Sequence, residues 1–335
     1  MIFIRTDANE IIGTGHVMRC LSIASKIKEL NEEVCFVIAD DKSKKIIEEQ
    51  GYRIICLDSI WNDLNQEIDD LCKLIEDASV TKILVDSYFV TEKYLRQLKE
   101  KTSVFYIDDI NSMSYPVDVL INYNIYGQNL DYSGINGRTL LGVAYAPLRK
   151  EFIGVEKRRF DGINKVLITS GGTDNYDIVG RILSKLLSLD NLRSKEFYCI
   201  LGRFNVNVES LQDRFNIHSN VHLLQNVSNM DYYMKKCDIA ITAGGSTSYE
   251  LCACGIPSIL YTIADNQLGI AKAFSEKDII SWAGDMREDM DACLDNIVHE
   301  INRLNDINRW ELQSRRMQDL VDGNGANRIA QEIIR

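Results

Sequence analysis

Short apolar runs alternate with amphipathic helical patterns along nearly the whole chain, and this alternation limits the possible folds more than any other feature. Within residues 15–30, for example, Val17, Leu21 and Ala24 recur at the spacing of one helix face. Alternating strands and helices are typical of a parallel sheet that helices cover on both faces. The strand-like runs of the first half are residues 2–6, 34–39, 53–57, 82–85, 104–107 and 117–121. The first half is therefore predicted to form a doubly wound α/β domain.

The same alternation starts again in the second half, after a charged stretch around residues 148–160. Its strand-like runs are residues 166–169, 197–201, 221–224, 239–242 and 258–261. A chain of 335 residues is long enough for two domains of ordinary size. We therefore predict an α/β protein of two Rossmann-like, doubly wound domains, residues 1–150 and 151–335. The polar helical tail over residues 301–335 either completes the second domain or crosses back to the first, and its pattern does not decide between them.

The composition is that of an ordinary globular protein and restricts the choice of partner. The net charge of −11 disfavours nucleic acid, because a protein that neutralises phosphates needs a basic face. The nine cysteines include no Cys-x-x-Cys pair and are interpreted as buried thiols in a reducing compartment. The sequence opens on a strand-like run without the features of a signal peptide, and no run reaches about 18 apolar residues. We therefore expect a cytoplasmic protein with no membrane insertion and no obligate protein partner.

An unusual loop follows the first strand, at the edge of an open parallel sheet where ligands bind. Gly13 and Gly15 let the backbone approach a ligand closely, and they place His16 at the start of the first helix. Since a helix N-terminus disfavours an imidazolium, a neutral His16 could act as a general base. The alternative is a glycine-rich turn whose histidine only caps the helix.

Three loops of the second half carry residues suited to binding phosphate. They contain Gly171, Gly172 and Thr173 in the first, Gly245, Ser246, Thr247 and Glu250 in the second, and Asn266 and Gln267 in the third. Backbone N–H groups, hydroxyls and helix N-termini can bind a phosphate, and amide side chains can donate to phosphate or sugar oxygens. Glu250 lies one turn into its helix, where it could bind the two ribose hydroxyls or instead complete a capping box. Neither a P-loop nor a dinucleotide-binding fingerprint is present.

These segments together resemble a known family. Gly244-Gly245-Ser246-Thr247 with Glu250, followed by Asp265-Asn266-Gln267, resembles the donor-nucleotide site of GT-B glycosyltransferases of the lipid II-forming N-acetylglucosaminyltransferase type. The opening, Arg5-Thr6-Asp7 with residues 13–20, is more specifically similar to the UDP-2,4-diacetamido-2,4,6-trideoxy-β-L-altropyranose hydrolases of pseudaminic acid biosynthesis, which have relatives in spore-coat polysaccharide synthesis. Further matches, in the family's order, are Asp86-Ser87-Tyr88, Asp108-Asp109, Tyr145-Ala146-Pro147-Leu148-Arg149 with Phe152, Ser170-Gly171-Gly172-Thr173-Asp174, and Asp322-Gly323 with Gly325.

The resemblance implies a GT-B architecture, in which a UDP-linked sugar binds in a cleft between the two domains. UDP would lie on the second domain. His16 would activate a water molecule, with Tyr88 beside it at the reacting sugar. The first loop would face the sugar and contribute Arg5, Asp7 and Arg19 to substrate binding.

The reaction that the resemblance implies is hydrolysis to UDP and free sugar, and the alternative is a glycosyltransferase that uses the same donor. A non-catalytic nucleotide-sugar-binding protein is a third possibility. A membrane-bound acceptor would call for an apolar or basic patch on the first domain, and the sequence shows none. No metal or other cofactor is predicted, since Asp108 and Asp109 are adjacent and their side chains should diverge.

Overall fold

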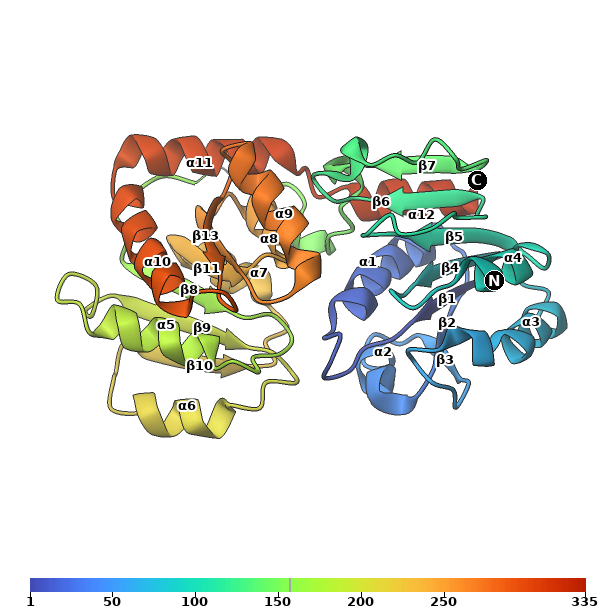
Figure 1. The fold of residues 1–335 in the computed structure, drawn as a ribbon, viewed down its shortest axis with the longest axis horizontal. Coiled ribbons are helices and arrows are strands. Elements are labelled where there is room, and N and C mark those ends of the chain that lie inside the picture. Colours follow the sequence, from blue (N-terminus) through green and yellow to red (C-terminus); the bar gives the residue numbers. More distant parts are fainter. Residues whose placement is uncertain (157) are drawn as a thin grey trace. The chain divides into compact units, whose positions relative to one another are not determined.

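The computed structural model describes residues 1–156 and 158–335, and it divides the chain into two compact α/β units (Figure 1). The first unit comprises Met1–Lys150 together with Asn324–Arg335, and the second comprises Glu151–Gly323. The predicted charged joint around residues 148–160 includes Lys157, which lies outside the described residues. Among the described residues, no helix is long and apolar enough to cross a membrane.

The first unit is built on a seven-stranded parallel sheet in the order β3-β2-β1-β4-β5-β6-β7. Its strands are β1 (Ile2–Thr6), β2 (Val34–Ile38), β3 (Arg53–Cys56), β4 (Lys82–Asp86), β5 (Ser103–Ile107), β6 (Val119–Asn122) and β7 (Arg138–Leu141). Its helices are α1 (Gly15–Glu29), α2 (Lys44–Glu48), α3 (Ile68–Asp77), α4 (Glu92–Lys99) and α12 (Gly325–Ile334). Every residue of β1 and β2 is buried, as expected for strands that are covered on both faces.

The second unit has a six-stranded parallel sheet in the order β10-β9-β8-β11-β12-β13. Its strands are β8 (Lys165–Thr169), β9 (Glu196–Leu201), β10 (Val221–Gln225), β11 (Ile239–Ala243), β12 (Ser258–Thr262) and β13 (Ser281–Asp285). Its helices are α5 (Ile178–Leu187), α6 (Val208–Phe215), α7 (Met230–Lys236), α8 (Thr247–Cys254), α9 (Asp265–Glu276), α10 (Met290–Leu304) and α11 (Ile307–Leu320). The predicted fold class, two Rossmann-like α/β units, is confirmed.

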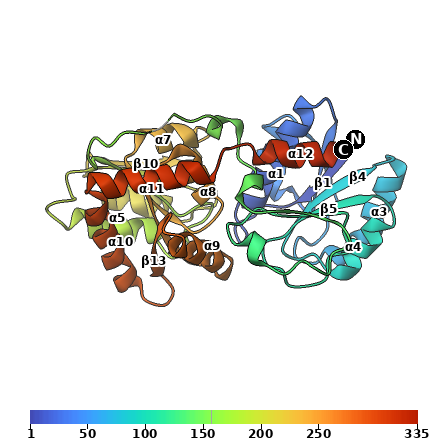
Figure 2. The same cartoon turned by 90° about the horizontal axis from the view of Figure 1, so that it is seen from above.

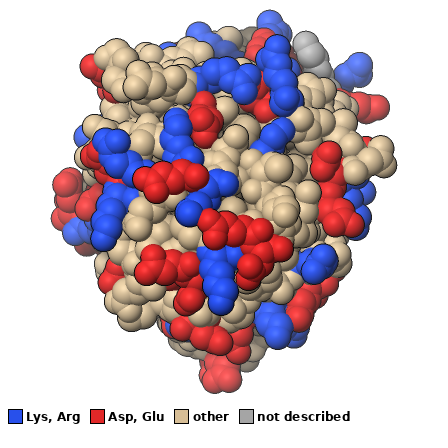
Figure 3. Space-filling view, turned by 90° about the vertical axis from the view of Figure 1, so that its right-hand side faces the viewer, with Lys and Arg blue, Asp and Glu red and all other residues tan. Residues whose placement is uncertain are grey.

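Positive and negative side chains are interspersed over the face of the first unit that Figure 3 shows. A phosphate backbone would require a basic stripe, and this face carries no large area of Lys and Arg alone.

The last helix, α12, packs in the first unit beside α1 (Figure 2), which corrects the predicted second domain of residues 151–335. Its apolar face is buried and consists of Ala326, Ile329, Ala330 and Ile333. Gly325 starts the helix against the backbone, because a Cβ there would lie 2.1 Å from the carbonyl oxygen of Ala146. Arg328 Nη1 donates to the carbonyl of Ala144 at 2.8 Å. The tail therefore crosses back, and α12 completes the cover of the first sheet.

Replacing Ile329 with Ala should destabilise the first unit by about 2–5 kcal/mol, because it empties a fully buried site between α12 and its neighbours. The same substitution at Ile334, which is only half-buried on the same helix, is the matched control and should cost less. Urea unfolding followed by circular dichroism measures both. Equal losses in the two variants would contradict the packing of α12 described above.

Candidate active site

The loop between β1 and α1 is a turn held by hydrogen bonds within the loop, and it fixes where α1 begins. Asn9 Oδ1 accepts hydrogen bonds from the backbone N–H groups of Ile11 and Ile12 at 2.9 and 3.0 Å. The N–H of Gly13 donates to the carbonyl of Asn9 at 2.8 Å, and Gly13 has a φ of 71°, which glycine adopts without strain. The turn thereby sets His16 into the first turn of α1.

His16 lies against a carboxylate from the neighbouring strand. In the sheet register Thr6 of β1 is opposite Asp86 of β4, so the two strand ends meet at the carboxyl edge. His16 Nδ1 lies 2.6 Å from Asp86 Oδ1, and both side chains are buried. The ring of Tyr88 meets the His16 ring edge-on, with centroids 4.4 Å apart. The sheet topology thus brings together His16 and Tyr88, the two predicted catalytic residues, and adds Asp86.

The guanidinium of Arg19 is held in the same cluster by two carboxylates. Arg19 bonds both oxygens of Asp86, at 2.5 and 2.6 Å, and both oxygens of Asp109, at 3.0 and 3.2 Å. Burial alone would raise the pKa of Asp86, but Arg19 and His16 hold it well below its usual range. Asp86 is therefore a carboxylate, and it is suited to orient His16 and to stabilise an imidazolium.

Three residues predicted to contact substrate are bound to other groups of the first unit. Arg5 is fully buried and binds Glu67 through Nε at 2.6 Å and Nη2 at 3.0 Å, while its Nη1 binds Asp7 at 2.5 Å. The other oxygen of Asp7 accepts the N–H of Ala39 at 2.8 Å. Arg19 is likewise committed to carboxylates. These contacts have one cause: each charged group is neutralised inside the first unit, because an unpaired buried charge is costly.

Asp86 and Asp109 are the functional candidates to which the sequence pattern assigned no role. The signal that could have found them is their position, since Asp86 ends β4 and Asp109 is the second residue after β5, at the edge where ligands bind. The predicted divergence of Asp108 and Asp109 is confirmed. Asp108 accepts from the hydroxyl of Tyr115 at 2.9 Å, whereas Asp109 turns to Arg19.

In the second unit, the three predicted phosphate loops lie side by side, because they follow the adjacent strands β8, β11 and β12. The hydroxyl of Tyr261 on β12 donates to the carbonyl of Thr169 on β8 at 3.0 Å. Gly244 packs so closely on α9 that a Cβ there would lie 3.3 Å from the carbonyl oxygen of Gln267. Topology therefore gathers at one edge the predicted residues Gly171, Gly172, Thr173, Gly245, Ser246, Thr247, Glu250, Asn266 and Gln267.

Two of the three helix N-termini at this edge, those of α5 and α8, differ in how they are capped. Asp174 accepts the N–H groups of Ile178 and Val179 at 2.7 and 3.2 Å, so the N-terminus of α5 already holds a carboxylate. The α5 N-terminus, which is predicted to assist phosphate binding, is therefore capped by a carboxylate of the chain itself. Ser246, the N-cap of α8, makes no side-chain capping bond, so the capping-box alternative gains no support from that residue. Of these two, the N-terminus of α8 is the better suited to an anion.

Two buried polar groups near the same edge were not predicted. Ser170 and Asn205 are 5% and 8% exposed, and in the described part of the chain Ser170 Oγ and Asn205 Nδ2 have no hydrogen-bond partner. Their loops touch, since the N–H of Phe204 donates to the carbonyl of Gly172 at 3.1 Å. Buried polar atoms are normally satisfied, so these two are candidates for ligand contacts.

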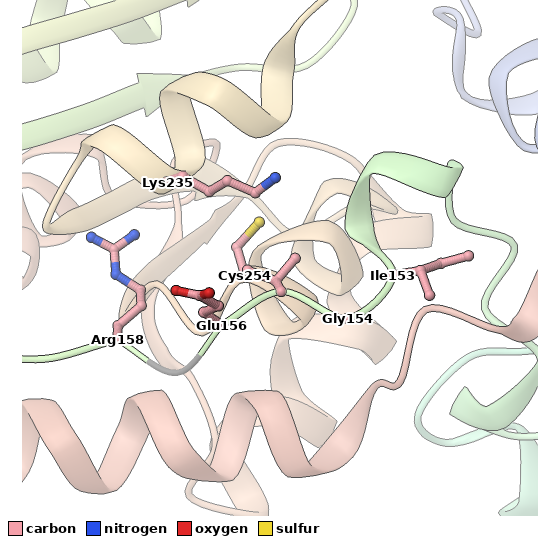
Figure 4. A pocket seen from close by; sticks show the side chains of 7 residues that line it. Ile153, Gly154, Glu156, Arg158, Lys235 and Cys254 are labelled. Atoms are coloured by element: carbon pink, nitrogen blue, oxygen red, sulfur yellow. The ribbon is translucent and has the colours of Figure 1, made fainter.

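A pocket of about 400 Å³ in the second unit lies away from these loops (Figure 4). Its lining includes Cys254 at the end of α8, whereas the phosphate loop precedes the start of that helix. Arg158 in its wall donates to the carbonyls of Met234 and Cys237 at 2.7 and 2.5 Å, and so caps α7. Within the described ranges, no group of three or more His, Cys, Asp or Glu side chains is arranged to hold a metal ion.

The chain is similar to several known proteins. The model of the glycosyltransferase family 28 C-terminal domain matches residues 166–306, which lie in the second unit. The uncharacterized protein MJ1062 of Methanocaldococcus jannaschii is 28% identical over 276 residues, which are 77% of this chain and 55% of that protein. The chain thus spans about half the length of this archaeal relative.

Two bacterial relatives match over most of their own length. The spore coat polysaccharide biosynthesis protein SpsG of Bacillus subtilis is 20% identical over 331 residues, 95% of this chain and 93% of that protein. The UDP-2,4-diacetamido-2,4,6-trideoxy-beta-L-altropyranose hydrolase of Campylobacter jejuni is 24% identical over 253 residues, 74% of this chain and 86% of that protein.

Among solved structures, MurG of Acinetobacter baumannii superposes with a TM-score of 0.72 at 12% identity, covering 99% of this chain and 98% of that one. At this identity the likeness concerns the fold, which is that of the GT-B enzymes. The chain is thus similar in sequence to SpsG and to the Campylobacter hydrolase, similar in its second unit to the family 28 glycosyltransferases, and similar in fold to MurG.

Proposed function

We propose that this protein hydrolyses a UDP-linked 2,4-diacetamido-2,4,6-trideoxy hexose to UDP and free sugar, as a step in nonulosonic acid biosynthesis. The observation that carries the proposal is the buried pair of His16 and Asp86 beside Tyr88, since it is suited to general-base catalysis. The name of the Campylobacter relative supports the substrate class. We propose that the reaction takes place in the cytoplasm. The nine cysteines of this chain are free thiols, and thiols stay reduced in that compartment.

The proposed reaction is a displacement at the anomeric carbon. Nε2 of His16 accepts a proton from water as the water oxygen forms a bond to that carbon. The bond from the carbon to the phosphate oxygen breaks, and its electron pair leaves with UDP. The carboxylate of Asp86 stabilises the imidazolium that forms, and attack from the opposite side inverts the anomeric configuration.

The leaving UDP is proposed to bind at the three loops of the second unit. The open N-terminus of α8 and the backbone N–H groups around Gly171 and Gly245 suit the charge that develops on the diphosphate. The amide of Asn266 can donate to the same group, whereas Gln267 already accepts the N–H of Ile263 at 2.9 Å through its oxygen. Glu250 is proposed to accept hydrogen bonds from the ribose hydroxyls.

The proposal is tested by incubating the pure protein with candidate UDP-sugars and following the mixture by NMR. The expected result is free sugar plus UDP without any acceptor, with an inverted first-formed anomer. A UDP-sugar that stays intact until an acceptor is added would contradict hydrolysis and establish transfer.

One observation favours the alternative, a glycosyltransferase. The sequence showed no apolar patch on the first domain, yet the structure exposes large apolar side chains in loops after β1, β3 and β4. Ile11 is 71% exposed, Ile60 47% and Phe89 36%. Trp61 packs on Phe89 with ring centroids 5.1 Å apart. An apolar acceptor could contact these side chains, so the acceptor arm of the NMR experiment includes a lipid-linked sugar.

Replacing Glu250 with Gln should weaken UDP binding roughly 10- to 100-fold, because a hydrogen bond to a charged group contributes about 1.5–3 kcal/mol. Isothermal titration with UDP measures the change. Glu276→Gln, at the exposed end of α9, is the matched control and should bind UDP like the wild type. UDP affinity that is the same in both variants would remove Glu250 from the nucleotide site.

A further inference from the structure

Arg287 is a positively charged side chain at the edge of the second sheet that is proposed to bind UDP, but it has no part in the binding described above. It follows β13, which pairs with β12, so its loop and the α9 loop leave the sheet side by side. Among the described residues, the loops directly after the six strands of this sheet contain two Lys or Arg residues, Arg203 and Arg287. A fixed cation matters at such an edge, because a diphosphate is an anion and a guanidinium binds phosphate oxygens well.

The guanidinium of Arg287 is anchored on the buried carboxylate of Asp285. The oxygens of Asp285 accept hydrogen bonds from Arg287 Nε at 3.0 and 3.2 Å and from Nη2 at 2.6 Å. The backbone N–H of Arg287 also donates to Asp285, at 2.9 Å. These bonds use Nε and Nη2, so Nη1 is the group of the guanidinium that is left for another partner.

Nη1 of Arg287 reaches the start of α9, where the third predicted ligand loop lies. It lies 2.8 Å from Oδ1 of Asp265, the residue before Asn266. The next residue along this loop, Gln267, packs against Gly244, where a Cβ would lie 3.3 Å from the Gln267 carbonyl oxygen. Contacts thus lead from Arg287 through the α9 loop to the loop before α8, which is proposed to bind the diphosphate.

The ion pair between Arg287 and Asp265 is of a kind that a ligand can replace. The side chain of Asp265 is 89% exposed, whereas that of Asp285 is 2% exposed. An ion pair with an exposed carboxylate contributes little to stability, because water solvates the separated charges well. The Asp265 side chain can therefore turn into solvent without leaving a buried charge, while Arg287 stays anchored on Asp285. A phosphate oxygen can then take the place of the Asp265 carboxylate at Nη1.

We infer that Arg287 is a binding residue for the diphosphate of the nucleotide, and that Asp265 occupies its Nη1 group until the ligand displaces it. The inference deepens the proposed function, since it rests on the placing of UDP at this edge. Asp265 thus competes with the phosphate: it holds Arg287 while no nucleotide is bound, and it has to leave when UDP binds. Removing the charge of Asp265 should therefore change UDP affinity in the opposite direction from removing Arg287.

The test compares UDP with uridine, which has the same base and ribose but no phosphate. Isothermal titration measures the affinity for UDP, and ligand-observed NMR titration measures the affinity for the weaker uridine. Arg287→Ala should weaken UDP binding roughly 10- to 100-fold, because a charge-assisted hydrogen bond to phosphate is lost, and should leave uridine binding unchanged. Asp265→Asn should strengthen UDP binding about 2- to 5-fold, because a surface ion pair no longer has to be broken.

Arg316→Ala is the matched control, because Arg316 pairs with Asp278 just beyond the opposite end of α9. This variant should bind UDP like the wild type. Uridine controls for damage to the site, since Arg287→Ala leaves the buried Asp285 without its partner. A general loosening of the loops would weaken the binding of both ligands, whereas loss of a phosphate contact weakens UDP binding alone.

Equal losses of UDP and uridine affinity in Arg287→Ala, or UDP affinity at the wild-type level in that variant, would overturn the inference. If Arg287→Ala does not fold, Asp265→Asn decides alone, and a UDP affinity that is unchanged or weaker overturns it. Failure of the proposed function is seen separately. A wild type that binds UDP, with variants that behave as expected, but releases no free sugar contradicts hydrolysis and leaves Arg287 in the nucleotide site. A wild type that does not bind UDP overturns the nucleotide site and this inference together.

Discussion

Replacing His16 with Ala is expected to lower kcat for UDP-sugar hydrolysis by about 10²–10⁴-fold, the usual contribution of a general base. The affinity for UDP should not change, because the nucleotide is proposed to bind to the second unit and His16 belongs to the first. Assays of UDP release give kcat, and isothermal titration gives the UDP dissociation constant. The combination of a large kinetic loss and unchanged binding is specific to a residue that acts in the transition state.

Two further variants make the His16 experiment decisive. His16→Gln retains a polar side chain of similar reach but has no basic nitrogen, so it should be as slow as the alanine variant. His299→Ala changes an exposed histidine on α10 and should hydrolyse the substrate at the wild-type rate. Turnover close to that of the wild type in either His16 variant would show that another group activates the water.

The sheets were predictable because most of their strands are continuous apolar runs that end at turns. Strands that are buried on both faces consist mostly of apolar residues, so they can be recognised in the local sequence. The two strands that were not predicted lack such a continuous apolar run. β7 (Arg138–Leu141) is an edge strand half exposed to solvent, and β13 (Ser281–Asp285) contains polar and small residues at most of its positions.

The candidate site was predictable only where function depends on local geometry. His16 was proposed because glycines set it at a helix start, and the three candidate phosphate loops were proposed because they follow strands. The roles of Arg5 and Arg19 were not readable, because their partners are distant in sequence. Arg5 binds Glu67, 62 residues away, and Arg19 binds Asp109, 90 residues away. A local sequence pattern does not distinguish an arginine that binds substrate from an arginine that is paired with a carboxylate distant in sequence.

Replacing Asp86 with Asn is expected to lower kcat by about 10³–10⁴-fold, the size of effect that follows when a catalytic histidine is held in the wrong tautomer. The oxygen of the new amide would accept from Arg19, and its NH₂ group would then donate to His16 Nδ1. KM should change little. Asp108→Asn, which alters a carboxylate outside the pair, serves as the control, and equal losses in the two variants would remove Asp86 from the mechanism.

The same Asp86→Asn variant should also change how stability depends on pH. Since the folded state holds the pKa of Asp86 well below the value of about 3.9 for an unfolded chain, the folded state binds fewer protons there in acid. The carboxylate therefore stabilises the protein fully above about pH 4, and this stabilisation is lost as the pH falls toward the folded pKa. Breaking the buried ion pair between Asp86 and Arg19 should lower the free energy of unfolding by up to about 3–5 kcal/mol near neutral pH. The loss should be smaller to the extent that Asp109 still neutralises Arg19. Thermal unfolding of the wild type and of Asp86→Asn should thus give a Tm difference that is largest near pH 6 and shrinks toward pH 3. A Tm difference that stays constant over this range would mean that Asp86 is not held ionised by Arg19 and His16.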